Sequence, residues 1–418
     1  MERELLKHII VENRELIQDL PLNERPFVFE QKGNYVFVGV RQAGKSYLLY
    51  QRMQQLLKQG YITEQMIYLN FDDERIVGMQ SEELDIILQA GKSMTEKDLV
   101  LFLDEIQNIK GWENFARRLA NQKYNVYITG SNAKMLSSEI ATTLGGRYFL
   151  QNVWPYSFKE YLSAKSISSD GNSWQYGNNL TKIIREFNTF FYYGGFPELV
   201  DISDKRAWLT GIYNKIFLSD VIVRNSIRNE QALRMTVRRL AYGVGQSSSF
   251  NRISNLVKSS GIKTNVASIL NYVQYLKESN LIFGLDNFVS KFVEKETIKK
   301  YYFVDNGLLN LFLTNPETAL LENLCAVHLY KIHKEQVYFY NKDFEVDFYV
   351  PDESRAIQVC YNLNNEVTLR REIQALEKLD AIYSLNELYI ITYDTEKTIL
   401  LNNGKSVSVV PVWKWILM

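Results

Sequence analysis

The spacing of apolar residues changes along the chain, and the changes divide it into parts. Residues 1–34 carry apolar side chains at helical spacing, and residues 35–153 alternate short apolar runs with amphipathic helical segments. Helical patterns dominate the part that follows, and strand patterns return from residue 299. We therefore expect three domains, at residues 1–160, 161–290 and 291–418.

The first part has the pattern of an α/β sandwich. Its apolar runs are separated by segments that predict helices, and no hairpin turn joins two of them. Strands that alternate with helices in this way pair in parallel, with helices on both faces of the sheet. The predicted strands are residues 35–40, 66–71, 99–105, 126–131 and 147–153.

The other two parts predict a helical region and a second α/β domain. Residues from about 245 to 285 have the pattern of helix, turn and helix followed by a short strand, which is the order of a winged helix. From residue 299 the strands KYYFVD, QVYFYN, EVDFYV, AIQVCY and LYIITY alternate with a few helices. The predicted fold class of the whole chain is α/β, with a central helical and winged-helix region.

The amino-acid composition excludes few classes of function. Lys and Arg together number 48, as do Asp and Glu, so the 418-residue chain has a formal net charge of zero. No overall attraction to nucleic acid or acidic lipid follows, although local basic patches are compatible with this balance. Two cysteines, Cys325 and Cys360, and three histidines are too few for a disulfide framework or a zinc site. Because no apolar run reaches the length of a membrane span, we expect a cytoplasmic protein with no membrane partner.

The segment GVRQAGKS, at residues 39–46, matches the phosphate-binding pattern G-x-x-x-x-G-K-[ST] at every fixed position. In such a loop the backbone N–H groups surround phosphate oxygens at a helix N-terminus, where the helix dipole also favours anions. Lys45 reaches the β- and γ-phosphates, and the Ser46 hydroxyl binds Mg²⁺. A turn that matches by chance is the alternative, and the strand before it and the helix after it argue against that. The expected nucleotide-binding residues are Gly39, Val40, Arg41, Gln42, Ala43, Gly44, Lys45, Ser46 and Tyr47.

Two carboxylates, Asp104 and Glu105, end the predicted strand LVLFLDE. Open α/β sheets bind their ligands at the carboxyl ends of their strands. We therefore expect Asp104 to hold the Mg²⁺ ion together with Ser46, and Glu105 to polarise the attacking water. Solvated acids at an ordinary strand end are the alternative, and the phosphate-binding pattern elsewhere in the same domain argues against it.

Two more residues are candidates for the hydrolytic step. Asn132 follows Ser131 just past a predicted strand, where these side chains are placed to contact the γ-phosphate or the attacking water. Arg147, in LGGRY, is a candidate for the arginine that neutralises transition-state charge, supplied by the same chain or a neighbouring subunit. A surface arginine that begins a strand is an equally good interpretation of Arg147. The guanine-recognition sequence N-K-x-D is absent, which favours ATP.

Longer stretches around these motifs resemble a known family. FVGVRQAGKSYLL, LVLFLDEIQNIKGWENFARRL, VYITGSNAKMLSSEIATTLGGRY and VWPYSFKEYL are similar to the prokaryotic AAA-superfamily ATPases, most of all to the branch with a C-terminal domain of unknown function. FYYGGFPELV and IYNKIFLSDVIVRN resemble the next two blocks of that branch. The resemblance implies an AAA-type ATPase core, a linking winged helix and a C-terminal nuclease-like fold.

The C-terminal part resembles the PD-(D/E)-x-K nuclease core. In that core an early Glu, a strand Asp and an (E/D)-x-K on the next strand bind Mg²⁺ and activate water. Glu322 and Asp347 match the first two positions, but Gln358 and Cys360 stand where an acid and the lysine are expected. Because glutamine carries no charge and cysteine supplies no ammonium group, we expect this degenerate site to be inactive as a nuclease.

Two functions are consistent with these patterns. The first is a Mg²⁺-dependent ATPase whose nucleotide state acts as a switch on a partner, either DNA or a protein. The second is a nucleic-acid-binding protein in which ATP gates docking with little turnover. ATP and Mg²⁺ are the expected ligands of both, and the sequence leaves the oligomeric state open.

Overall fold

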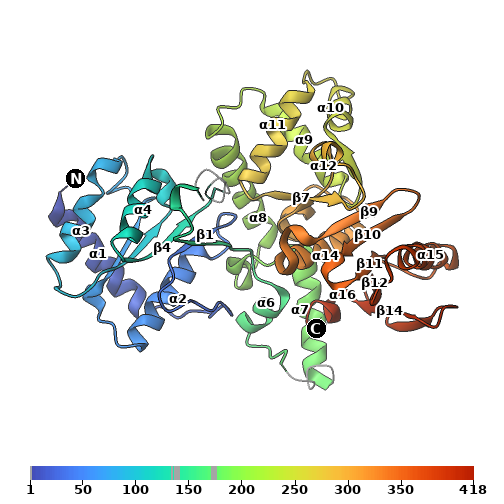
Figure 1. Cartoon of the computed structure of the whole chain (residues 1–418), viewed down its shortest axis with the longest axis horizontal. Helices are drawn as coiled ribbons and strands as arrows, with labels where there is room; N and C mark the ends of the chain where they lie inside the picture. The colour runs from blue at the N-terminus through green and yellow to red at the C-terminus, as the bar shows by residue number, and fades with distance from the viewer. Residues whose placement is uncertain (1, 133–134, 136–141, 171–176) are drawn as a thin grey trace. The chain divides into compact units, whose positions relative to one another are not determined.

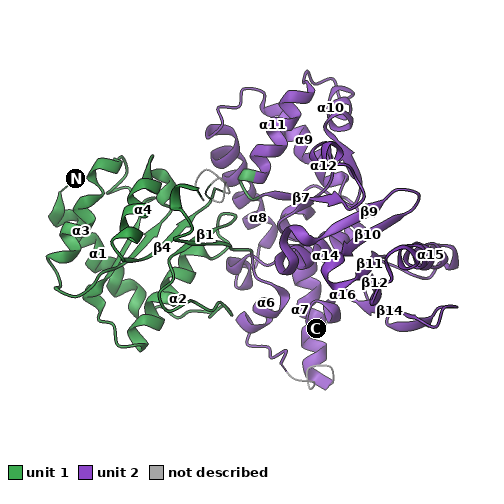
Figure 2. Ribbon diagram, viewed as in Figure 1, with its two compact units in different colours: residues 1–154, 278–280 green, residues 155–277, 281–418 purple. Residues whose placement is uncertain are grey.

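The structure of the chain, a computed structural model, describes all residues except 1, 133–134, 136–141 and 171–176 (Figure 1). The chain folds into two compact units (Figure 2). The first contains residues 1–154 and the short segment 278–280, and the second contains residues 155–277 and 281–418. Within the described residues, no helix combines the length and the apolar character needed to cross a lipid bilayer.

The first unit is built on a five-stranded sheet with the order β2-β3-β4-β1-β5. Every pair of neighbouring strands is parallel, as the alternation of strands and helices predicts. The β4 strand lies between β1 and β3, so the strand before the phosphate loop and the strand that ends in the two acids flank a common neighbour. The strands are β1 (Tyr35–Val38), β2 (Met66–Asn70), β3 (Val100–Asp104), β4 (Asn125–Gly130) and β5 (Phe149–Asn152).

Helices cover the sheet of the first unit, and the strands are apolar because both faces are buried. All residues of β1 and β3 are buried, and the core joins their side chains to apolar residues of the surrounding helices. The first helix packs on α3 and on β2, which anchors the N-terminal segment to the sheet. The helices are α1 (Arg3–Gln18), α2 (Lys45–Lys58), α3 (Asp85–Lys92) and α4 (Trp112–Asn121).

The second unit begins with a helical region. A π-helical segment, Ile216–Val223, continues directly from α8, and α9 and α10 pack against each other (Figure 1). The helices up to α11 are α6 (Phe158–Ala164), α7 (Gly177–Tyr193), α8 (Lys205–Lys215), α9 (Glu230–Tyr242), α10 (Phe250–Lys258) and α11 (Val266–Glu278). The later helices are α12 (Phe292–Thr297), α13 (Asn306–Asn310), α14 (Glu317–His333), α15 (Glu366–Tyr383) and α16 (Val412–Trp415).

A mixed nine-stranded sheet, in the order β13-β14-β12-β11-β10-β9-β7-β8-β6, forms the rest of the second unit. The five strands expected after residue 299 correspond to β8–β12, whereas the sequence patterns did not indicate β6, β13 and β14. The sheet also crosses residue 290, where a domain boundary was expected, because β7 pairs with both β8 and β9. The strands are β6 (Ser247–Ser249), β7 (Ile282–Asn287), β8 (Ile298–Phe303), β9 (Tyr338–Asn341), β10 (Glu345–Val350), β11 (Arg355–Val359), β12 (Glu387–Thr392), β13 (Lys397–Leu400) and β14 (Ser406–Pro411).

Candidate functional site

The loop between β1 and α2 has a backbone that its glycines make attainable. A Cβ atom on Gly39 would lie 2.0 Å from the carbonyl oxygen of Val153, so any larger residue there collides with backbone. Gly44 precedes α2 with φ 92°, in the left-handed region that glycine adopts without strain. Gln42 also has a positive φ, of 59°. The loop therefore bends sharply and delivers the N-terminus of α2 to the carboxyl edge of the sheet, where anions are favoured.

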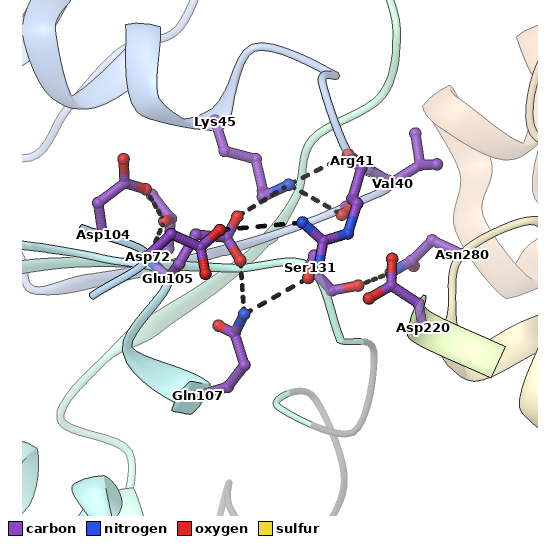
Figure 3. A network of polar contacts seen from close by, with 12 residues as sticks. Val40, Arg41, Lys45, Asp72, Asp104, Glu105, Gln107, Ser131, Asp220 and Asn280 are labelled. Atoms are coloured by element: carbon purple, nitrogen blue, oxygen red, sulfur yellow. Dashed lines mark hydrogen bonds and ion pairs between the residues drawn. The ribbon is translucent and has the colours of Figure 1, made fainter. Parts of the chain in front are cut away.

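Lys45, the first residue of α2, has a buried ammonium group that points back across this loop (Figure 3). Its Nζ donates hydrogen bonds to the carbonyl oxygens of Gly39 and Val40, both at 3.1 Å. The same atom lies 3.7 Å from Oε1 of Glu105. The lysine thus occupies the loop with its charge balanced by a carboxylate, in the place where the sequence predicts a triphosphate.

Asp104 ends β3 and is almost completely buried. The Tyr68 hydroxyl donates to its Oδ2 at 2.6 Å, and the Thr129 hydroxyl donates to its Oδ1. Burial raises the pKa of Asp104 and the neighbouring Glu105 charge raises it further, whereas hydrogen bonds from Thr129, Tyr68 and Ser46 act in the opposite direction. The structure therefore brings Ser46 and Asp104, the two predicted Mg²⁺ residues, within hydrogen-bonding contact.

Glu105 follows directly with a left-handed backbone, φ 54° and ψ 38°. Its N–H donates to Oγ1 of Thr129 at 3.0 Å, which fixes this uncommon conformation. Burial alone would raise the pKa of Glu105, but Lys45, the Gln107 amide and Arg41 lower it below its ordinary value. The carboxylate is therefore ionised at neutral pH and able to accept a proton.

Polar side chains beside Glu105 extend the network shown in Figure 3. Nε2 of Gln107 contacts Oε2 of Glu105 at 2.5 Å and Oγ of the buried Ser131 at 3.4 Å. Asn132 is half-buried and follows Ser131 at the end of β4, next to residues outside the described part of the chain. Ser131, the first of the pair predicted past this strand, is therefore part of the Glu105 network.

The remaining predicted residues differ in their positions. Arg41 approaches Asp72, with 3.8 Å between Nη1 and Oδ2. Tyr47 is 48% exposed, and its ring centroid lies 5.4 Å from that of Tyr50. Arg147 is exposed and donates to Asn121 Oδ1 at 2.6 Å, at the end of α4. Because Arg147 precedes a strand of a parallel sheet, it lies at the amino edge, opposite the phosphate loop, and the structure does not bring it to this site.

Sequence patterns missed the residues that hold the two acids in place. Thr129 bridges them through one hydroxyl, and Tyr68 reaches Asp104 from β2. Both lie inside apolar strand patterns, where threonine and tyrosine are ordinary strand residues. Only the order β2-β3-β4 places them on either side of β3.

A second polar cluster lies within the second unit, around the fully buried Lys300 of β8. Its Nζ is 2.8 Å from Glu345, 3.5 Å from Glu322 and 3.4 Å from Asp347. The Gln358 side chain accepts a hydrogen bond from the Asp347 N–H at 2.8 Å. The structure therefore brings together Glu322, Asp347 and Gln358, the three nuclease-like positions, and adds a lysine that comes from a different strand.

This cluster is electrostatically unusual. Burial raises the pKa of Glu322; the Lys300 ammonium opposes this rise, and the Asp347 charge adds to it. Burial alone would lower the pKa of Lys300, but Glu322, Asp347 and Glu345 together raise it above its ordinary value. Across the part of the chain that the structure describes, no group of three or more His, Cys, Asp or Glu side chains is arranged to hold a metal ion.

Comparisons with known proteins agree with the fold of the first unit. A family model described as an AAA domain matches residues 31–162, and another, described as a domain of unknown function (DUF8612), matches residues 184–319. The uncharacterized protein MJ1544 of Methanocaldococcus jannaschii is 33% identical over 431 residues, which cover 99% of this chain and 95% of that protein. An uncharacterized protein of Haemophilus influenzae is 32% identical over 65% of this chain and 67% of its own length.

Among solved structures, the Walker-type ATPase PABY2304 of Pyrococcus abyssi is 14% identical with a TM-score of 0.41, over 71% of this chain and 99% of that one. The ORC1 protein of Aeropyrum pernix, solved in complex with DNA, is 14% identical with a TM-score of 0.31, over 78% and 94% of the two chains.

The parallel sheet, the glycine-lined loop and the acid pair define a P-loop protein of the AAA class. The chain belongs to the same family as MJ1544 and is an AAA-domain P-loop ATPase that also carries DUF8612.

Proposed function

We propose that this protein binds ATP with Mg²⁺ at the loop of residues 39–47, hydrolyses it, and acts through its nucleotide state as a switch on a partner. The observation that carries the proposal is the meeting of Lys45, Ser46, Asp104 and Glu105 at one edge of the sheet. These four side chains supply a cation for phosphates, two oxygen ligands for a metal ion and an ionised base.

Each residue has a role in this proposal. The backbone N–H groups of residues 39–47 surround the phosphates, and Lys45 exchanges its two loop carbonyls and Glu105 for phosphate oxygens. Ser46 and Asp104 hold Mg²⁺, which when bound neutralises charge on the β- and γ-phosphates. Glu105 accepts a proton from the attacking water, and Ser131 and Asn132 orient that water or the γ-phosphate. Arg147, at the opposite edge of the sheet, is proposed to act only when supplied to a neighbouring subunit.

The direct test is ATP binding by the Lys45→Ala variant. We expect calorimetric titration to show Mg·ATP binding to the native chain and its loss in the variant, because the buried Lys45 ammonium group is the cation that bonds the carbonyl oxygens of the loop. Lys58→Ala removes an exposed lysine from the same helix, and it is expected to bind ATP like the native chain. Absence of Mg·ATP affinity in the native chain would contradict the proposal.

Thr129→Val is expected to slow hydrolysis by about tenfold or more while the affinity for ATP changes little. Valine has the shape of threonine but removes the hydrogen bonds to Asp104 and to the Glu105 N–H, and a buried unpaired group of this kind costs about 1–3 kcal/mol. The measurement is the split between kcat and KM. The control is Thr236→Val, which changes a buried threonine whose hydroxyl donates to the Ala232 carbonyl within its own helix, α9. Equal losses in both variants would show a general folding defect instead of positioning.

The elements between residues 230 and 303 support the proposed winged helix. In chain order they are α9, β6, α10, α11, β7 and β8, so two helices are followed by an antiparallel pair of strands. The short β6 strand adds to the edge of that pair. This arrangement supports DNA as a partner in the alternative function, in which ATP gates the docking of nucleic acid.

The C-terminal elements support the proposed nuclease-like fold and its inactivity. Asp347 lies on β10 and Gln358 on the neighbouring antiparallel strand β11, while Glu322 comes from α14. The positions of Asp347 and Gln358 on neighbouring strands are those that the nuclease resemblance predicts. The amide of Gln358 is used in hydrogen bonds to the backbone of β10, which is a structural role. We propose a scaffold or binding surface instead of a second catalytic centre.

A further inference from the structure

A cavity of about 140 Å³ lies between α9, α10 and the strands β6 and β8. Both polar and apolar side chains line it, and two of the polar ones are arginines. The residues that bear on its chemistry are Arg239, Tyr242, Gln246, Ser248, Arg252 and Tyr301. Each polar side chain that lines the cavity carries at least one N–H or O–H donor, and no carboxylate is among the lining residues. The cavity is therefore suited to an anion.

The two arginines lack the partners that arginines usually have. Nη2 of Arg239 donates to Oγ of Ser260 at 3.0 Å, and Nη1 of Arg252 donates to the Ser247 carbonyl at 3.2 Å. Within the described residues, neither guanidinium group forms an ion pair. Nε of Arg239 is buried and has no hydrogen-bond acceptor among those residues. Two positive charges therefore share one cavity that has no carboxylate among its lining residues.

A buried charged donor without an acceptor is unfavourable, and the loss is recovered when a ligand supplies that acceptor. Guanidinium groups present their N–H donors in a planar fork that matches tetrahedral oxyanions in a bidentate manner. The volume also fits, since a water molecule takes about 30 Å³ in the liquid and a phosphate group is only a few times larger. A single chloride ion would leave most of the cavity and its donors unused.

We propose that this cavity binds a phosphate group, with Arg239 and Arg252 as its cationic ligands and the hydroxyl and amide groups of Ser248 and Gln246 as additional donors. The site is formed by α9, β6, α10 and β8, and none of its lining residues comes from α11, the second helix of the helix–turn–helix. It is also separate in sequence from the loop of residues 39–47. The phosphate is either free, as in inorganic phosphate or a monoester, or part of a nucleic-acid backbone.

The test uses the full chain carrying Lys45→Ala, so that the loop of residues 39–47 makes no contribution to phosphate binding. Titration with inorganic phosphate, followed by calorimetry, is expected to show saturable binding. Arg239→Gln and Arg252→Gln are each expected to weaken it about tenfold or more, because each removes charged hydrogen bonds to the ligand. Arg252 is exposed, so its replacement leaves folding intact even if Arg239→Gln does not.

Arg238→Gln is the matched control, because it removes the same charge from the residue of α9 that directly precedes Arg239 and does not line the cavity. It is expected to change phosphate affinity less than about twofold, as a surface charge does. A lack of saturable binding, or equal weakening by Arg238→Gln, would overturn the proposal.

A short DNA duplex is then added to the phosphate-bound chain. If the duplex displaces phosphate, and Arg239→Gln weakens its binding as well, the natural ligand is a nucleic-acid backbone. If phosphate stays bound, the natural ligand is free phosphate or a monoester. If the cavity bound no phosphate, the proposal of ATP binding at residues 39–47 would be unaffected. If the loop bound no ATP, the cavity could still bind phosphate.

Discussion

Glutamine in place of Glu105 is expected to reduce ATP hydrolysis by about 10²–10⁴-fold while Mg·ATP binding persists. The carboxylate is held 3.7 Å from Lys45 and is ionised, because Lys45, Gln107 and Arg41 keep its pKa low despite burial. Glutamine preserves the size of the side chain, but it removes the charge that faces Lys45 and accepts no proton from water. Hydrolysis is measured as phosphate release at saturating ATP, and binding is measured by calorimetry.

The control for this prediction is Glu96→Gln. Glu96 is an exposed acid on the loop that leads into β3, at the amino end of the strand that Glu105 follows. The same change of charge there is expected to leave hydrolysis within about twofold, because exposed charges distant from a site contribute little. If Glu105→Gln retained native turnover, the assignment of the base would be wrong, although the binding role of the loop would stand.

The sequence was sufficient to predict the parts of the candidate site that depend on local patterns. Residues 39–46 follow one another in the chain, and the bend at Gly44 and the start of the helix at Lys45 follow from residue types alone. The acid pair was also predictable, since an apolar run that ends in Asp104 and Glu105 predicts a buried strand with carboxylates at its edge. Their assigned chemical roles remain predictions.

Residues that act across strands were not predictable in the same way. Thr129 is in contact with Asp104 and Glu105 only because β4 pairs with β3, and a strand order is not encoded in the spacing of apolar residues. Lys300 is a similar case. The nuclease pattern places its lysine at residue 360, two positions after Gln358, whereas the cation comes from β8, more than fifty residues earlier in the chain. It joins the acids because β7 links β8 to the C-terminal strands.

Lys300→Met is expected to destabilise the second unit by about 3–5 kcal/mol near pH 8, the range found when one partner of a buried ion pair is removed. Methionine is similar in length, so packing against the Phe339 ring is retained and the loss is mainly electrostatic. Three carboxylates, from Glu322, Glu345 and Asp347, would remain without their cation. The measurement is the urea midpoint of the transition in which the second unit unfolds.

The pH dependence separates this electrostatic effect from a packing defect. In the native chain, Lys300 has a raised pKa, so its stabilising charge is present at neutral pH and is lost only at strongly alkaline pH. Without the ammonium, the pKa of Glu322, which burial and the Asp347 charge already raise, should rise further above that of the unfolded chain, and such a group favours the folded state only where it is protonated. The loss of stability should therefore be largest near pH 8 and smaller near pH 5.

Lys299→Met is the matched control for Lys300→Met, since the adjacent lysine pairs with Asp286 at a partly exposed position. Its replacement is expected to reduce stability by less than about 1 kcal/mol, with little dependence on pH. If Lys300→Met lowers the free energy of unfolding equally at pH 5 and pH 8, the lysine stabilises the fold through packing and not through its charge. A loss that shrinks on acidification would show that one ammonium group holds three acids together, in the part of the fold where the nuclease resemblance predicts metal chemistry.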